Sequence, residues 1–325
     1  MKHVGVVGVG SYLPKKILTN FDLEKMVNTS DEWIMTRTGI RERRLAAKKE
    51  ATSDLAISAA KRALKNAKIK PENLDLIIVA TITPDMQFPS TACFVQVGLG
   101  AKNAVCFDIS AACAGFVYAL VTAQQFIARG TYKNALVIGA ETLSTITDWQ
   151  DRNTCVLFGD GAGAVVLASV NQGGILSTYL GSDGTMTDLL MIPAGGSRHP
   201  ATRETIDKRM HYIKMRGNEL FKVAVKTMSE ATFKVLTQAG VDHKDVDCLI
   251  PHQANLRIIS AVAKKIGIPT EKIYLNIDRY GNMSSASTAV ALCEAVEERR
   301  ITKGDTVLLV AFGAGLVWGS CVIKW

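Results

Sequence analysis

Two blocks of this 325-residue sequence match two later blocks at nearly the same spacing. Residues 59–80, "AAKRALKNAKIKPENLDLIIVA", align with residues 231–252, "ATFKVLTQAGVDHKDVDCLIPH", and place Asp75 opposite Asp247, an offset of 172 residues (247 − 75). A second pair of blocks, "TYKNALVIGAE" and "TKGDTVLLVAF", places Ala140 opposite Ala311 at an offset of 171. These offsets are far longer than a solenoid repeat. The sequence therefore predicts a duplicated domain, with halves 1–172 and 173–325.

Each half alternates apolar, strand-like runs with longer helix-like segments, which is the α/β pattern. The best strand candidates are 4–8, 74–80, 104–109, 135–139, 164–168, 246–250 and 306–311. The best helix candidates are 52–67, 114–129, 220–239, 256–266 and 286–299. We therefore predict an α/β fold in which two equivalent halves pack together.

Charge and composition exclude several classes of protein. The net charge of +8 favours an anionic partner, but the aromatic content is only 6% and no basic–aromatic stripe occurs, so we expect no nucleic acid. Seven cysteines without a CxxC motif indicate reduced thiols and a cytoplasmic location. The histidines lack ligand spacing, so no metal is expected. The longest apolar stretch, around 111–123, is too short to span a membrane, and no signal peptide is evident.

Four candidate groups follow predicted strands or precede predicted helices in both halves. Cys113 follows the strand 104–109, and His252 follows the strand 246–250. Asn282 precedes the helix that starts near 286, and the run 306–311 ends at a Gly-rich bend that suggests a β-hairpin. Ligand sites in open α/β sheets form beyond the carboxyl ends of strands. We therefore expect these groups to meet at one crevice.

Cys113 has two interpretations. A free cysteine in an apolar run is most often a small buried hydrophobe. At a helix N-terminus, however, unpaired N–H groups and the positive end of the helix dipole favour the thiolate, which is the form that acts as a nucleophile. The helix that follows is apolar nearly all round, so we expect it to be buried.

The other candidates also have ordinary explanations. His252 could be a core histidine bonded to a carbonyl group, and Asn282 a turn residue ahead of serines that suit a helix N-cap. The polar, irregular segment 185–212 predicts a mobile flap over the site. Residues 29–44 begin with Thr29-x-x-Glu32, which predicts a capping box and a helix with Trp33 and Arg37 on one face.

Taken together, six motifs in order resemble one family of enzymes. They are "DISAACAGFVYAL", "FGDGAGAVVL", "NELFKVAV", "IPHQANLRI", "YGNMSSAS" and "AFGAGLVWGS". The chain resembles 3-oxoacyl-[acyl-carrier-protein] synthase III from about residue 3 to residue 325. The resemblance implies the thiolase fold, in which two similar βαβαβαββ halves stack as a five-layer α-β-α-β-α sandwich.

The resemblance also implies a reaction, the initiating condensation of type II fatty-acid synthesis. A short acyl-CoA and malonyl-acyl-carrier protein give 3-oxoacyl-carrier protein, CoA and CO2. Cys113 would carry the acyl group, and His252 and Asn282 would donate to the malonyl thioester oxygen during decarboxylation. The backbone N–H groups of Cys113 and Ala314 would form an oxyanion hole, with Phe312 lining the pocket. The family often has Gly at position 314.

Further residues match the family's binding surfaces. The residues that would contact CoA are Thr29, Trp33, Arg37, Arg152 and Asn218, with the indole and the Arg152 guanidinium on either side of the adenine. The residues that would dock the acidic carrier protein are Lys222, Arg257, Lys264 and Lys265. Phe88 would reach across a homodimer and close the partner's acyl pocket. Acyl-CoA enters as a substrate, so no further cofactor is implied.

Two alternatives stay open at the level of the sequence. The chain could be a paralogous condensing enzyme of specialised metabolism, or a non-catalytic acyl-CoA-binding sensor on the same fold. A sensor needs none of Cys113, His252 and Asn282, so the presence of all three argues against it. The starter acyl group is also open, because pockets discriminate a methyl group by only about 1–3 kcal/mol.

Overall fold

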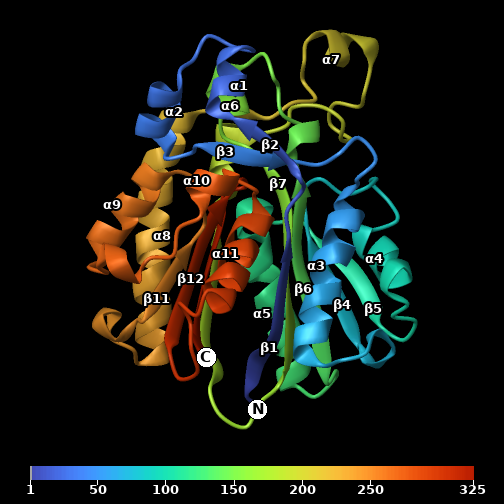
Figure 1. The fold of residues 1–325 in the computed structure, drawn as a ribbon, viewed down its shortest axis with the longest axis vertical. Helices are drawn as coiled ribbons and strands as arrows, with labels where there is room; N and C mark the ends of the chain where they lie inside the picture. The colour runs from blue at the N-terminus through green and yellow to red at the C-terminus, as the bar shows by residue number, and fades with distance from the viewer. Residues whose placement is uncertain (1) are drawn as a thin grey trace.

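Two mixed β-sheets form the frame of the protein in a computed structural model that describes residues 2–325 (Figure 1). The first sheet has the strand order β1-β7-β6-β4-β5. Its strands are β1 (Val4–Tyr12), β4 (Leu76–Ala80), β5 (Val105–Ile109), β6 (Asn134–Thr142) and β7 (Asp160–Ser169). The second sheet has the order β11-β12-β13-β8. Its strands are β8 (Gly174–Ser182), β11 (Cys248–Pro251), β12 (Thr306–Gly313) and β13 (Val317–Lys324).

The two sheets repeat one topology. In each sheet, the strand that comes first in the sequence pairs antiparallel with the strand that comes last, β1 with β7 and β8 with β13. The last strand also pairs antiparallel with the strand before it in the sequence, β6 or β12. That strand pairs parallel with its other neighbour in the sheet, β4 or β11. The aligned residues Asp75 and Asp247 accept equivalent hydrogen bonds. The carboxylate of Asp75 accepts a hydrogen bond from the backbone N–H of Lys133, just before β6, and that of Asp247 from Thr306, at the start of β12. Residue 172 lies between β7 and β8.

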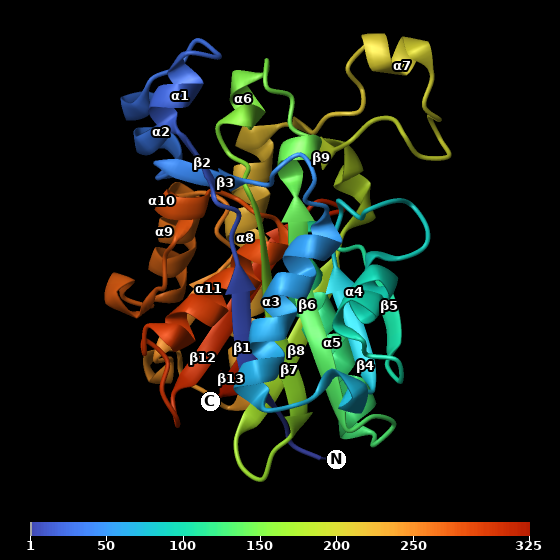
Figure 2. The same ribbon diagram turned by 45° about the vertical axis from the view of Figure 1, so that its right-hand side comes forward.

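Helices lie outside and between the sheets (Figures 1 and 2). The long helices are α3 (Thr52–Ala67), α4 (Thr91–Leu99), α5 (Gly115–Ala128), α8 (Gly217–Ala239), α9 (Leu256–Ile266) and α11 (Ser285–Glu297). Helices α3 and α4 cover the outer face of the first sheet, α8 packs on the second sheet with α9 beside it, and α5 and α11 lie between the sheets. This is the predicted α-β-α-β-α sandwich.

Apolar cores between these layers hold them together. The largest buried cluster lies between the sheets and includes Phe116 and Leu120 of α5 and Leu292 of α11. A second lies between α3, α4 and the first sheet, and a third between α8, α9 and the second sheet. The two middle helices contact both sheets, and α5 is buried along most of its length, as its apolar sequence predicted. Burial of this apolar surface is the main favourable contribution to folding.

Shorter elements gather at the end of the sandwich opposite the chain termini (Figure 1). The strands are β2 (Lys16–Thr19), β3 (Glu42–Leu45), β9 (Leu190–Met191) and β10 (Lys214–Met215). The α-helices are α1 (Asn20–Glu24), α2 (Asp31–Thr38), α6 (Arg152–Cys155), α7 (Arg203–Asp207) and α10 (Ile277–Tyr280). The 3-10 helices at this end are η2 (Ala112–Ala114), η3 (Leu143–Thr145) and η4 (Gly184–Leu189). The other three, η1 (Pro71–Asn73), η5 (His243–Asp245) and η6 (Thr270–Lys272), lie toward the opposite end, where β4 and β11 begin.

The predicted capping box at Thr29 is wrong. Helix α2 starts one residue later, and Ser30 is its N-cap, with its hydroxyl accepting from the N–H of Trp33. Both residues are good cap formers, so the sequence alone did not separate them. Trp33 and Arg37 do lie on one helix face, with the Arg37 Cζ 5.3 Å from the centre of the indole ring.

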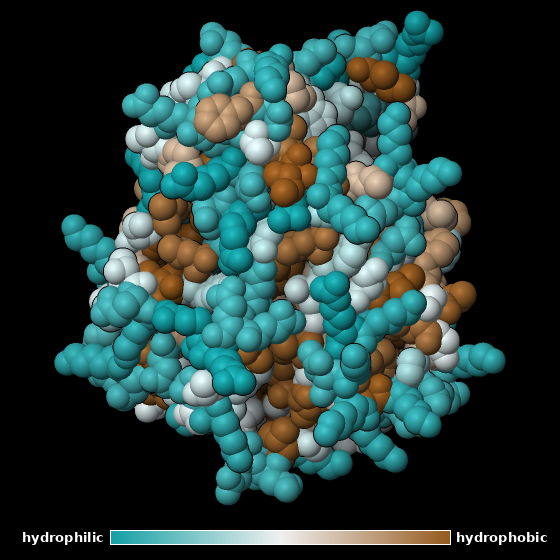
Figure 3. Space-filling view, viewed as in Figure 1, coloured by the Kyte–Doolittle hydropathy of each residue, from teal (hydrophilic) through white to brown (hydrophobic). Residues whose placement is uncertain are grey.

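The surface is mostly hydrophilic, with apolar patches between charged side chains on the face shown in Figure 3. No helix among residues 2–325 combines the length and apolar character that crossing a bilayer requires. All seven cysteines are free.

Candidate active site

Three side chains from distant segments line one cavity of about 510 Å³. They are Cys113, His252 and Asn282, and the ring of Phe312 joins them. Each follows a strand or precedes a helix at the same end of the two sheets, as the topology predicted. The cavity continues outward past α2 and the start of α8, where Trp33 and Asn218 line it.

Cys113 lies at a tight turn between β5 and α5. It is the middle residue of η2, and the preceding Ala112 has a left-handed φ of 42°, which is strained for a residue with a Cβ atom. Helix α5 begins two residues later, at Gly115. The side chain is 7% exposed. The fold therefore holds the thiol at a helix N-terminus with little freedom.

Burial dominates the electrostatics of this thiol. Desolvation raises the pKa of Cys113 to about 12, and the negative charge of Glu141 adds to that rise. The backbone N–H of Cys113 does lower the pKa of the thiol, as expected at a helix N-terminus, but the desolvation cost is larger.

His252 directly follows β11, and its backbone N–H donates to the carbonyl of Val310 on β12 at 2.8 Å. This bond continues the parallel pairing of β11 and β12, so the backbone at position 252 is fixed by the sheet. The imidazole is 2% exposed, and burial lowers its pKa to about 3. The ring is therefore neutral at physiological pH, and one of its nitrogens carries a proton that can be donated.

Asn282 is held by backbone bonds on both sides. Its N–H donates to the carbonyl of Leu157, and its carbonyl accepts from the N–H of Gly159. The preceding Gly281 has a φ of 63°, and an added Cβ there would lie 2.6 Å from the carbonyl of Leu157. The side-chain Oδ1 accepts from the N–H of Ser284. The Nδ2 group of Asn282 is thereby left as the donor available to the cavity.

The predicted hairpin after β12 is present and completes the wall around the thiol. β12 and β13 pair antiparallel across residues 314–316. Ala314 lines a second cavity of about 420 Å³ that also contains Cys113. Gly313 was missed by sequence reasoning: a Cβ there would lie 2.6 Å from the backbone nitrogen of Cys113, so only glycine permits this approach. The Gly-rich bend was the available signal.

The second cavity is mostly apolar. It extends from Cys113 between the side chains of Ile82, Leu143, Phe158, Leu190 and Ile213. Phe158 and Leu190 also line the first cavity, so the thiol lies where two chambers meet. Such a chamber can hold a short acyl chain beside the sulfur atom.

The predicted nucleotide-binding residues gather at the outer end of the first cavity. The Arg152 Cζ lies 4.5 Å from the centre of the Trp33 ring, and Arg152 Nη1 donates to the carbonyl of Asn28 at 2.7 Å. The guanidinium and the indole are already in contact, so a purine could enter between them only after the arginine moved. The hydroxyl oxygen of Thr29 is buried and has no hydrogen-bond partner within residues 2–325.

The four predicted docking residues are all exposed, Lys222 on α8 and Arg257, Lys264 and Lys265 on α9. Lys222 and Arg257 line the mouth of the first cavity, and the two later lysines do not. The guanidinium of Arg257 lies 5.8 Å from the ring of Phe221. A positive surface therefore borders the entrance.

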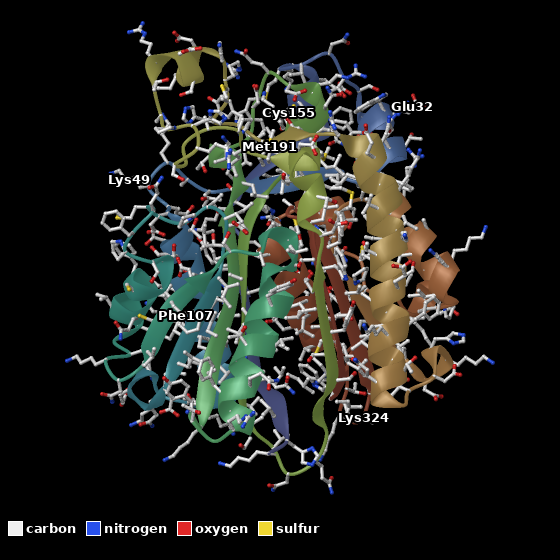
Figure 4. The ribbon with its side chains drawn as sticks, turned by 180° about the vertical axis from the view of Figure 1, so that it is seen from behind. Glu32, Lys49, Phe107, Cys155, Met191 and Lys324 are labelled. Carbon is white, nitrogen blue, oxygen red and sulfur yellow. The ribbon has the colours of Figure 1, made fainter. Side chains whose placement is uncertain are left out.

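Phe88 does not line either cavity of its own chain, and its side chain is 84% exposed. It lies in the loop between β4 and α4. The neighbouring strand β5 is an edge strand, and Val105 on it is exposed while Phe107 is half-buried (Figure 4). This side of the sheet therefore presents apolar side chains beside an unpaired strand edge.

The segment 185–212 lies partly over the site. Thr187, Leu190, Met191 and Ile192 line the second cavity, and Met191 is labelled in Figure 4. The rest of the segment projects away from the sandwich and carries α7 (Figure 2). Asp148 anchors its far end through ion pairs with Arg209 and Lys214. The predicted flap is therefore a cavity wall with an anchored outer loop.

Within residues 2–325, no group of three or more His, Cys, Asp or Glu side chains is arranged to hold a metal ion. The site's donor set is one thiol, one imidazole and one carboxamide. It matches acyl-transfer chemistry better than metal coordination.

Comparison with known proteins agrees with the geometry. Residues 107–184 match the family model described as 3-oxoacyl-[acyl-carrier-protein] synthase III, and residues 236–325 match the model for its C-terminal part. The chain is 62% identical to the beta-ketoacyl-[acyl-carrier-protein] synthase III of Caldanaerobacter subterraneus subsp. tengcongensis, over 99% of this chain and 97% of that protein.

Solved structures give the same result. The crystal structure of 3-oxoacyl-[acyl-carrier-protein] synthase III from Aquifex aeolicus has a TM-score of 0.92 and 52% identity, covering 99% of this chain and all of that one. The priming beta-ketosynthase of the R1128 polyketide pathway has a TM-score of 0.93 at 34% identity, covering 99% of this chain and 96% of that one. The polyketide enzyme is thus as similar in fold but more distant in sequence.

Proposed function

The chain belongs to the 3-oxoacyl-[acyl-carrier-protein] synthase III family, and on this premise we propose that Cys113, His252 and Asn282 divide its reaction between them. It is an acyltransferase, the initiating condensing enzyme of type II fatty-acid synthesis. The observation that carries the proposal is that these three side chains line one cavity.

In the first half-reaction the sulfur of Cys113 attacks the thioester carbonyl of a short acyl-CoA. The new C–S bond forms as CoA leaves, and the acyl chain occupies the apolar cavity beyond the thiol. The backbone N–H groups of Cys113 and Ala314 stabilise the oxyanion, and the loss of one such donor typically costs about 10²–10³ in rate. An alanine at 314 keeps its N–H, so the hole persists.

In the second half-reaction malonyl-acyl-carrier protein enters the first cavity and loses CO2. Negative charge develops on the thioester oxygen, where neutral His252 and the Nδ2 group of Asn282 both donate hydrogen bonds. Phe312 keeps the departing carboxylate in an apolar environment. The resulting carbanion attacks the acyl group on Cys113. Decarboxylation itself generates the carbanion, so this step requires no metal and no added base.

The two substrates also bind to different sets of residues. Thr29, Trp33, Arg37, Arg152 and Asn218 hold CoA at the outer end of the cavity. Arg257, with Lys222, Lys264 and Lys265, attracts the acidic carrier protein to the positive entrance. The acidic carrier protein is thus the anionic partner that the net charge of +8 favours.

The protein acts as a homodimer in the cytoplasm. An unpaired edge strand with apolar side chains is a template for pairing with a second copy, and Phe88 extends from that side far enough from its own cavities to serve the partner's. Seven free thiols suit a reducing compartment.

A coupled assay tests the function. The purified protein is incubated with acetyl-, propionyl-, isobutyryl- or isovaleryl-CoA and malonyl-carrier protein, and the mass of the carrier protein is measured. The proposal predicts a 3-oxoacyl-carrier protein that Cys113→Ser fails to form. Binding of acyl-CoA without product from any of the four would instead indicate the non-catalytic sensor.

A further inference from the structure

One wall of the apolar cavity beside Cys113 belongs to a segment that lies outside the two main sheets. We call residues 189–216 the wall segment. Its outgoing and returning stretches run side by side, because β9 pairs with β10 and backbone hydrogen bonds continue the pairing on both sides. The position of this paired segment therefore decides how much room an acyl group has. The side chains that it contributes to the cavity are those of Leu190, Met191, Ile192 and Ile213.

The other side of the cavity belongs to the frame of the fold. Leu143 directly follows β6, Cys113 lies in η2, and Val317 is the first residue of β13. Sheet pairing and the buried core hold these residues in place. The wall segment lacks such support, and its outer loop projects away from the sandwich (Figure 2). The width of the cavity therefore depends on what holds the wall segment.

Asp148 joins the wall segment to the body of the protein. It lies in the loop between η3 and α6, and its side chain is 5% exposed. Arg209 donates to both carboxylate oxygens, from Nε at 3.0 Å and from Nη2, and Lys214 Nζ lies 3.5 Å from Oδ2. Beside them, the Ile213 N–H donates to the carbonyl of Ile146 at 3.0 Å. These bonds hold the returning stretch of the wall segment.

The pair of Asp148 and Arg209 differs from an ordinary surface ion pair, which contributes little to stability. The carboxylate is buried, and the guanidinium meets both of its oxygens, which is the geometry of the strongest charge-assisted hydrogen bonds. The hydrogen bonds from Arg209 lower the pKa of Asp148 to about 2, so the carboxylate is ionised at neutral pH. We call this pair the tether.

The backbone of Arg209 indicates that its side chain has a specific role. Arg209 follows the last turn of α7 with a left-handed φ of 54°. Glycine is the usual residue at such a position, and an arginine there is strained. Strain of this kind persists where surrounding contacts fix the residue. The side chain that arginine brings meets the Asp148 carboxylate and lies 4.9 Å from the ring centre of Tyr212.

We infer that Asp148 is a positioning residue that, through Arg209, holds the wall segment against the acyl cavity and so limits the size of the acyl group that Cys113 accepts. The inference rests on the proposed function, because it concerns the acyl-CoA of the first half-reaction. With the tether in place, the cavity closes on a short acyl chain and keeps its carbonyl carbon at the sulfur atom. Without it, the wall segment moves outward, so a short chain loses contacts and a longer chain gains room.

The test compares Asp148→Asn and Arg209→Gln with the wild-type protein. Asparagine keeps an acceptor for the Gln150 N–H, which Asp148 Oδ1 accepts at 3.0 Å, but it loses the charge. Acylation of Cys113 by acetyl-CoA and by hexanoyl-CoA is followed by intact mass after rapid mixing. A pocket discriminates one methylene by about 10–200-fold, and we expect the acetyl-to-hexanoyl rate ratio to fall about tenfold in both variants. General damage would lower both rates and leave the ratio unchanged.

Three control variants separate the tether from other effects. Arg203→Gln changes an exposed arginine on α7, whose nearest carboxylate lies 3.9 Å away, and its rate ratio should match the wild type. The double variant of Asp148→Asn and Arg209→Gln should differ from each single variant by less than about twofold, because both changes remove one interaction. Arg209→Lys keeps the charge without the two-point geometry, so its ratio should lie between those of the wild type and Arg209→Gln.

Hydrogen–deuterium exchange measures the hold on the wall segment directly. The amides of β9, β10 and Ile213 should exchange about tenfold faster or more in Asp148→Asn, because local opening becomes easier. The amides of β6 and β12 should exchange at the wild-type rate. Unchanged exchange in β9 and β10 would show that the tether does not hold the wall segment, and the inference would be wrong.

The rate ratios decide between the inference and the proposed function. Ratios within twofold of the wild type in both single variants would overturn the inference and leave the proposed function intact. An effect of Arg203→Gln as large as that of Arg209→Gln would overturn it as well. A wild-type protein that forms no acyl-Cys113 from either acyl-CoA would contradict the proposed function, and the inference would fall with it.

Discussion

The side-chain oxygen of Asn282 accepts a hydrogen bond from the backbone N–H of Ser284 at 2.8 Å. Because the oxygen is occupied, the carboxamide presents its NH2 group to the cavity that contains Cys113 and His252. The orientation of the amide thus follows from the strained turn at the start of α11. It gives Asn282 a defined task, donation to a developing negative charge.

Asn282→Asp tests that task with little change in shape. The carboxylate keeps an acceptor for the Ser284 N–H but loses the donor and adds a charge that repels the developing oxyanion. We expect malonyl-carrier protein decarboxylation to fall about 10²–10³-fold or more. A radiolabelled-CO2 release assay measures it, and a loss below threefold would be incompatible with the assigned role.

Gly313→Ala tests the close approach of β12 to the nucleophile. The new Cβ would lie 2.6 Å from the backbone nitrogen of Cys113, so η2 must shift. A displacement of about 1 Å at a reacting group can cost about 10²-fold, and we expect acylation to fall by that order. Gly196→Ala is the control, because an added Cβ there meets no atom within 4 Å. Equal rates in the two variants would refute the packing argument.

Trp33→Ala tests the nucleotide end of the cavity. Removal of an aromatic platform beneath a base typically costs about 1–3 kcal/mol, so we expect the KM for acetyl-CoA to rise about tenfold or more with little change in kcat. Trp33→Phe keeps an aromatic face and should lose less. Steady-state kinetics measure both, and an unchanged KM in Trp33→Ala would place the adenine elsewhere.

The sequence predicted the frame of the fold better than its short elements. Helices α3 and α9 have the predicted bounds, because their apolar faces repeat clearly. Strand β8 was not among the predicted strands: it is an edge strand with mostly half-buried residues and lacks a clean alternation. Among the small elements around the site, the helix that carries Trp33 and Arg37 was predicted. The others were not, because they are fixed by contacts distant in sequence.

The candidate site was also predicted only in part from the sequence. Cys113, His252 and Asn282 were predictable, because each occupies a strand end or a turn that duplicated topology brings together. Glu141 was not, because its surroundings come from complete burial and from hydrogen bonds to residues distant in sequence. The depth of burial at Cys113 likewise reversed the expected direction of its pKa shift.

Arg257→Glu tests the positive entrance. The exposed guanidinium borders the cavity mouth on α9, so reversing its charge should slow the approach of an acidic carrier protein. We expect kcat/KM for malonyl-carrier protein to fall about tenfold at low salt, with a smaller difference at high salt. Lys303→Glu, an exposed charge change in the loop before β12, is the control. Equal effects of the two changes would rule out a local docking surface.

The central claim is that Cys113 carries the acyl group while Asn282 acts in decarboxylation. A two-stage measurement of the protein's intact mass tests it most directly. Acetyl-CoA is added first, and malonyl-carrier protein second. We predict one acetyl group on the wild type and on Asn282→Asp, with none on Cys113→Ser. The second addition should remove the acetyl group from the wild type but not from Asn282→Asp. An acetyl group found on Cys113→Ser would contradict the account. So would removal of the acetyl group from Asn282→Asp at the wild-type rate.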